Sequence, residues 1–167
     1  MSGSDQGEVY YEVMSARLDA ERDRRTTLET RGTTVVTSSA ALVSLGLLLT
    51  ALVAGKDYRF QSGASVLVLI ALGLFVLAGG AALMAGQLHK YKVPTDETLK
   101  SCLDEHWTDT AVSARLAAAW MNLESILSLR SGNDKKAWWL NWALRFQVFA
   151  IMALAVAAVW EIGVNAN

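Results

Sequence analysis

Cysteine and proline are almost missing from this sequence of 167 residues. It has one cysteine, Cys102, and one proline, Pro94. A single cysteine excludes an internal disulfide and a cysteine-rich metal site. The net charge is −1, so bulk charge gives no reason to expect a nucleic-acid partner. Residues 1–31 are rich in charge and have no short apolar core, so we expect no cleavable signal peptide.

Catalytic motifs are missing too. The sequence has no HExxH or GxSxG motif, no Walker loop and no glycine-rich fingerprint after a strand. No segment shows the sustained alternation of a β-strand. The two histidines, His89 and His106, have no clear nucleophile or paired carboxylate around them. We therefore expect an all-α protein that is not an enzyme and uses no cofactor.

One short stretch raises the question of a metal. Cys102 and His106 are four residues apart, and Asp109 follows closely. A structural metal site usually needs more nitrogen and sulfur ligands than this. A solvated helix face accounts for these residues, and we expect no metal.

Long uncharged apolar runs are what the sequence does contain. One extends from Thr33 to Gly55 and another from Gly63 to Leu88. Each exceeds about 20 residues, enough to cross roughly 30 Å of hydrocarbon at about 1.5 Å per residue. We predict membrane crossings over 33–54 and 64–88. The connection between them is short, which makes the two helices antiparallel neighbours.

A third crossing is predicted near 139–161, within a helix over 134–161. Trp138, Trp139 and Trp142 lie near one end of that segment and Trp160 at the other. Tryptophan favours both membrane interfaces, and this spacing matches about 33 Å of helix. The preceding Ser131-Gly132-Asn133 is typical of a helix stop, with Asp134 capping the next helix.

Arg145 lies inside the cytoplasmic third of this third crossing. In one interpretation its long side chain snorkels back to the interface. In the other it faces a polar interior and has a functional role, beside Gln147 or the hydroxyl residues of the first crossing.

Those hydroxyl residues open the first crossing. Small hydroxyl side chains in a membrane helix bond to their own backbone or to a neighbouring helix. They serve helix packing or, with Arg145, line a polar path in an assembled oligomer. The candidate residues of the path are Thr33, Thr34, Thr37, Ser38 and Arg145.

The remaining segments predict a cytoplasmic helical layer. Residues 8–31 form a helix that is either a solvated amphipathic helix or an interfacial or partner-binding one. Pro94 breaks the chain after the second crossing, Thr95 caps the next helix, and helices occupy 95–131. Near its end a periodic apolar stripe indicates a candidate partner-binding face. It consists of Val112, Leu116, Trp120, Leu123 and Leu127.

Charge predicts the orientation. Five arginines precede the first crossing, seven Lys or Arg lie between His89 and Ala137, and none follow Trp160. The positive-inside rule then places the N-terminus and residues 89–137 in the cytoplasm of a cell with an inner (plasma) membrane.

The layout resembles a known group of proteins. A charged helix enters a small-residue crossing, ERDRRTTLETRGTTVVTSSAALVSLGLLLTAL, and a basic turn, SGNDKKAWW, leads into the last crossing. This resembles the Pycsar transmembrane effector domain and related small membrane effectors of bacterial anti-phage nucleotide-signalling systems. The resemblance spans roughly residues 20–88 and 130–160. It differs from many Pycsar effectors, which carry a cyclic-nucleotide-binding domain for which this sequence leaves no room.

Two hypotheses of function remain open. The resemblance implies an effector that assembles as a homo-oligomer in the lipid bilayer and damages the inner membrane when a nucleotide-sensing or nucleotide-producing partner signals infection. The alternative is a non-toxic membrane scaffold that recruits a cytosolic partner through its cytoplasmic amphipathic helices. No nucleic acid is expected in either case.

Overall fold

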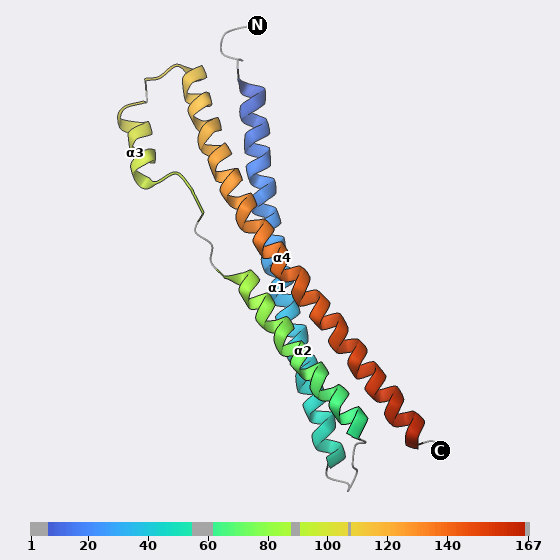
Figure 1. Cartoon of the computed structure of the whole chain (residues 1–167). Coiled ribbons are helices and arrows are strands. Elements are labelled where there is room, and N and C mark those ends of the chain that lie inside the picture. The colour runs from blue at the N-terminus through green and yellow to red at the C-terminus, as the bar shows by residue number, and fades with distance from the viewer. Residues whose placement is uncertain (1–6, 55–61, 88–90, 107, 166–167) are drawn as a thin grey trace. The chain divides into compact units, whose positions relative to one another are not determined.

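The structure, a computed structural model, describes residues 7–54, 62–87, 91–106 and 108–165. These residues form four helices, α1 (Glu8–Ala54), α2 (Ser62–Gly86), α3 (Asp96–Asp104) and α4 (Ala111–Asn165), and no strand (Figure 1). The all-α class expected from the sequence is confirmed. Three of the helices, α1, α2 and α4, are long and apolar enough to cross a membrane.

The chain divides into two compact units. Unit 1 comprises residues 1–27 and 88–135, and unit 2 comprises residues 28–87 and 136–167. Both α1 and α4 run without a break through this division. The segments expected separately at 8–31 and 33–54 are therefore one helix of 47 residues.

The expected helix stop at Ser131-Gly132-Asn133 is wrong, because α4 continues through it. Gly132 and Asn133 are buried in unit 1 by contacts that a sequence pattern does not reveal. A Cβ on Gly132 would lie 2.7 Å from Cε1 of Tyr91, so only glycine leaves room for that ring. Tertiary contacts of this kind outweigh the roughly 1 kcal/mol by which glycine disfavours a helix.

Unit 2 is built on small residues that recur every seven positions. On α2, Ala64, Ala71, Ala78 and Ala85 are all buried. On α4 the same spacing buries Ala143, Ala150 and Ala157, and on α1 it buries Gly32 and Ser39. A seven-residue repeat corresponds to 3.5 residues per turn, the period of helices that wind around each other with a left-handed twist.

The three long helices pack together in one buried cluster of unit 2. Val35 of α1, Ala82 of α2 and Ala143 of α4 are buried together. The backbones approach closely, since a Cβ on Gly32 would lie 3.8 Å from the carbonyl oxygen of Ala82. Small residues allow this close approach. In a lipid environment, van der Waals packing between closely spaced helices stabilises their association.

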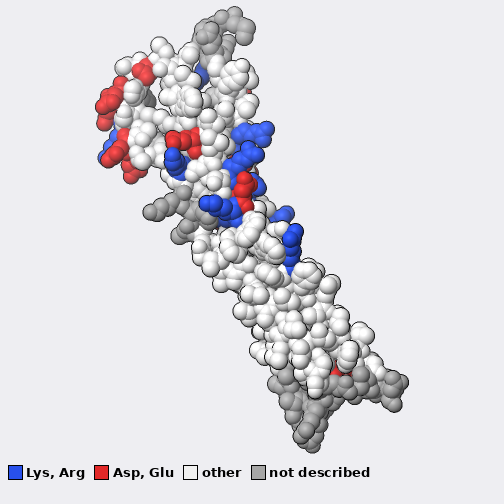
Figure 2. Space-filling view, in the orientation of Figure 1, with Lys and Arg blue, Asp and Glu red and all other residues white. Residues whose placement is uncertain are grey.

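Two polar contacts align α1 and α4 in unit 2. Lys136 Nζ lies 2.7 Å from Glu29 Oε1, and Gln147 Nε2 donates to Ser38 Oγ at 2.8 Å. Because both pairs advance in the same chain direction, α1 and α4 run parallel. Figure 2 shows most of the Lys, Arg, Asp and Glu side chains of this face gathered over one part of the surface.

Unit 1 joins the first part of α1 to the first part of α4, with α3 beside them. Leu18 of α1 and Leu129 of α4 are its buried large apolar residues among those described. The prediction that Thr95 caps a helix is confirmed, since its side chain accepts a hydrogen bond from the Thr98 backbone N–H. The acidic residues Asp96 and Glu97 occupy the first turn of α3, where they suit the helix dipole.

Candidate functional site

The hydroxyl residues of α1 point in two directions. Thr33, Thr34 and Thr37 are exposed, and each hydroxyl donates at 3.0 Å to the carbonyl oxygen four residues earlier. Ser38 is half-buried and accepts the amide hydrogen of Gln147. The candidate polar path is therefore divided, with one hydroxyl inside unit 2 and three on its surface.

Arg145 does not join this set within one protomer. Its side chain is exposed, and its guanidinium carbon lies 5.2 Å from the centroid of the Trp142 ring. Among the residues that the structure describes, Arg145 forms no ion pair. The residue that contacts one of the hydroxyl residues is Gln147, which donates to Ser38.

Sequence reasoning missed the buried ion pair of Lys136 and Glu29. The Lys136 side chain is only 2% exposed, whereas that of Glu29 is 42% exposed. A buried ammonium requires a compensating charge, because removing it from water costs several kcal/mol. The signal in the sequence is a spacing: Lys136 stands seven residues before Ala143, at a position of the seven-residue repeat of buried small residues on α4.

A second missed cluster lies in unit 1, at the residues read as a helix stop. The Asn133 amide donates to the backbone oxygen and to Oε2 of Glu21, both at 2.9 Å. The Arg24 guanidinium is 2.9 Å from Asp134 and 3.7 Å from Glu21. This cluster ties α4 to α1 at the point where unit 1 ends.

Tyr91 packs into the same region of unit 1. Its ring lies against Gly132 and under the Arg25 guanidinium, whose carbon is 4.6 Å from the ring centroid. The next residue is fastened as well, since the Lys92 backbone N–H donates to Ser128 Oγ at 2.8 Å and Lys92 Nζ contacts Glu124 at 3.2 Å. The chain that follows α2 is thereby held on α4.

The candidate partner stripe on α4 is open. Leu116 is 60% exposed and Trp120 is 65% exposed, with Val112 and Leu127 exposed too and Leu123 half-buried. In unit 1 the buried residues of this helix are instead others, Ser125 and Leu129 among them, and α4 contacts α1 through Asn133 and Asp134. Large apolar side chains that stay exposed on one helix face mark an interaction surface.

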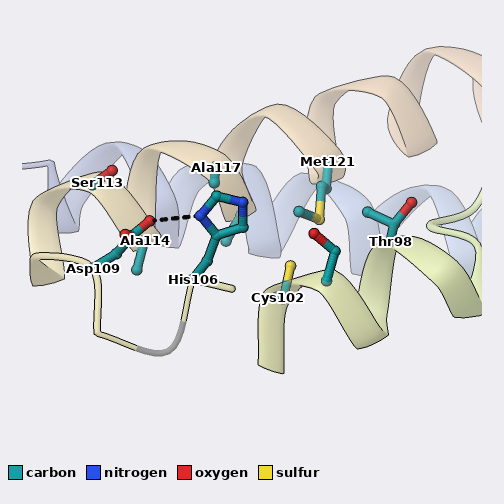
Figure 3. A pocket seen from close by; sticks show the side chains of 10 residues that line it. Thr98, Cys102, His106, Asp109, Ser113, Ala114, Ala117 and Met121 are labelled. Carbon is teal, nitrogen blue, oxygen red and sulfur yellow. Dashed lines mark ion pairs between the residues drawn. The ribbon is translucent and has the colours of Figure 1, made fainter. Parts of the chain in front are cut away.

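A pocket of about 650 Å³ lies between α3 and the start of α4 (Figure 3). Ala114, Ala117 and Met121 contribute its apolar lining, and Cys102 and His106 line it from the α3 side. His106 Nδ1 is 3.2 Å from Asp109 Oδ2. No group of three His, Cys, Asp or Glu side chains placed to hold a metal occurs among the described residues. Leu99 and Leu103, four residues apart on α3, are exposed, and Trp107, the next residue at that spacing, lies outside the described residues.

Comparison with known proteins gives no family for this chain. No family model matches it, and no match was found among curated proteins or solved structures.

Proposed function

We propose that this protein is a bacterial membrane effector module that assembles in the inner membrane and impairs its integrity in anti-phage defence. Three helices long and apolar enough to span a membrane support a multi-pass protein. The excess of Lys and Arg in residues 1–31 and 89–137 supports a cytoplasmic N-terminus and a cytoplasmic unit 1. The resemblance to Pycsar effectors supports the defence role.

The observation that carries the proposal is the continuity of α1 and α4. Each has its first part in unit 1, where Arg24 of α1 and Asp134 of α4 form an ion pair, and ends as an apolar segment of unit 2. A helix without a break transmits a shift or rotation along its length, whereas a loop would absorb it. A nucleotide-sensing or nucleotide-producing partner that engages unit 1 would thereby act on the membrane segments.

The test is expression in bacteria with a membrane-potential dye. We expect the wild-type chain, with its genomic neighbours present, to depolarise cells when the signal is triggered. Ser131→Pro removes a backbone hydrogen bond from α4 near the end of its part in unit 1 and should abolish depolarisation at unchanged membrane level. Ser131→Ala is the matched control and should behave as wild type. Cells that stay polarised with the wild-type chain and all its neighbours would refute the proposal.

A second candidate function rests on the exposed α4 stripe. In this alternative the protein is a membrane scaffold that recruits a cytosolic partner through Leu116, Trp120 and their neighbours. It predicts a complex that wild type forms and Leu116→Lys loses, with no change in membrane potential. Depolarisation by the wild-type chain contradicts this alternative directly.

A further inference from the structure

The outer face of α1 at residues 33–44 is unlike a lipid-facing surface, whereas Leu45, Leu47 and Leu48 beyond it expose large apolar side chains. Every exposed residue of this face between positions 32 and 44 is small. By contrast, the outer face of α2 exposes large apolar side chains such as Leu69, Val76 and Leu83. Small and hydroxyl residues are typical of helix–helix interfaces in membranes. The α1 small face consists of Thr33, Thr34, Thr37, Ala40, Ala41 and Ser44.

The outer face of α4 is complementary in size and polarity. It is large and aromatic, and Arg145 is the only Lys or Arg in residues 137–165. A cation at hydrocarbon depth costs about 2.5–3.5 kcal/mol on insertion scales unless it finds polar partners. The α4 outer face consists of Trp138, Trp142, Arg145, Val148, Phe149 and Met152.

The two faces carry their polar groups at the same depth. The Ser38–Gln147 hydrogen bond aligns parallel α1 and α4 in unit 2. Thr37 stands one residue before Ser38, and Arg145 stands two residues before Gln147. At about 1.5 Å per residue, their depths agree to within about 2 Å.

We infer that the α1 small face of one copy binds the α4 outer face of a second copy, head to tail, with Arg145 donating to the Thr33 and Thr37 hydroxyl oxygens. Each threonine already donates its own hydrogen to the backbone and keeps lone pairs that can accept. The inference rests on the proposed membrane insertion and deepens it, since it names the surfaces through which the effector assembles.

Equal depth is what such an assembly requires. Copies inserted in the same direction differ only by rotation about the membrane normal, so groups that meet between copies must lie at one level. A contact between two different faces repeats from copy to copy and closes into a ring when the rotation permits.

Disulfide crosslinking in membranes tests the contact. In a Cys102→Ser background, Ala40→Cys and Phe149→Cys sit two residues beyond Ser38 and Gln147, at matched depth and about one helical turn beyond Arg145. The double variant should give a ladder of dimers and larger species under mild oxidation. Each single variant should remain monomeric. The matched control, Val76→Cys with Phe149→Cys, pairs α4 with the outer face of α2 and should also remain monomeric.

Substitutions then test the polar contact. Arg145→Leu should reduce the ladder at least tenfold at equal membrane level, and Thr33→Val with Thr37→Val should act in the same direction while preserving shape. An undiminished ladder in Arg145→Leu would show that the arginine only reaches lipid headgroups and would overturn its assigned role. A dimer from Ala40→Cys alone, or no ladder from the double variant, would overturn the head-to-tail contact.

The inference and the proposed function fail separately. Depolarisation by a chain that gives no ladder refutes the contact and leaves the effector function standing. A ladder that depends on Arg145 in cells that remain polarised supports the contact and refutes the effector function.

Discussion

At the scale of single residues, polar contacts set the alignment of α1 with α4. A slip along the helices would leave buried polar groups unpaired, which costs about 1–3 kcal/mol for each group. The small apolar residues around them have no such directional requirement, so the polar contacts decide the register. The three pairs are Glu21–Asn133, Glu29–Lys136 and Ser38–Gln147.

The ion pair of Lys136 and Glu29 predicts an asymmetric response. Glu29→Leu leaves the buried ammonium of Lys136 without its carboxylate partner and should destabilise the protein by about 2–3 kcal/mol. Lys136→Met leaves a half-exposed carboxylate that water can still reach, so it should cost less. Thermal unfolding of the detergent-solubilised variants measures both. Equal losses would contradict the burial difference.

We expect the change in stability caused by Gly132→Ala to have opposite signs with and without the Tyr91 ring. Gly132→Ala improves helix propensity by about 1 kcal/mol, but the new Cβ meets the Tyr91 ring and should destabilise by about 1–3 kcal/mol overall. In a Tyr91→Ala background the same substitution should stabilise. Gly79→Ala, where the Cβ meets nothing within 4 Å, is the control and should stabilise in both backgrounds. Unfolding temperatures of the four combinations decide the matter, and an unchanged sign would be evidence against the contact.

At the scale of elements, α4 has two faces with different roles in unit 1. One includes Leu129, which is 6% exposed, and contacts α1 through Asn133, and the other presents the stripe that includes Trp120. The periodicity of the sequence predicted an apolar partner-binding face over Val112–Leu127, and most of that face is exposed. The buried residues of this part of α4 are instead Ser125, Leu129, Gly132 and Asn133, and Gly132 lies against the Tyr91 ring.

We expect truncating a side chain to alanine to lower the stability of the protein by different amounts on the two faces of α4. Trp120→Ala should change stability by no more than about 0.5 kcal/mol, as expected for an exposed site. Leu129→Ala removes a buried side chain and should cost about 2–5 kcal/mol. Chemical or thermal unfolding compares the two. A large loss in Trp120→Ala would show that the stripe is already covered in the isolated protein.

At the scale of the whole molecule, the proposed three crossings would place the chain ends on opposite sides of the membrane. The parallel course of α1 and α4 in unit 2 is compatible with this topology. With Cys102 replaced by serine, a cysteine at Asn165 should react with an impermeant reagent in intact cells, and one at Ser4 should not. The reverse labelling pattern would invert the topology, and labelling at both positions would contradict an odd number of crossings.

The sequence alone determined the helical class, the three long apolar helices and the Thr95 cap, because length, composition and local propensity specify these features. It placed the second apolar helix over 64–88, and α2 covers Ser62–Gly86. The seven-residue alanine spacing was visible too, but its meaning depends on which helices face each other.

Only the tertiary structure decided what Gly132 and Asn133 do. Their local pattern favours a helix end, yet Asn133 bonds to Glu21, 112 residues earlier, and Gly132 accommodates Tyr91. The same holds for Gln147 rather than Arg145 as the partner of Ser38. A side chain carries the same local signal whether it caps a helix or packs against another, and the neighbour that folding brings to it determines which role it takes.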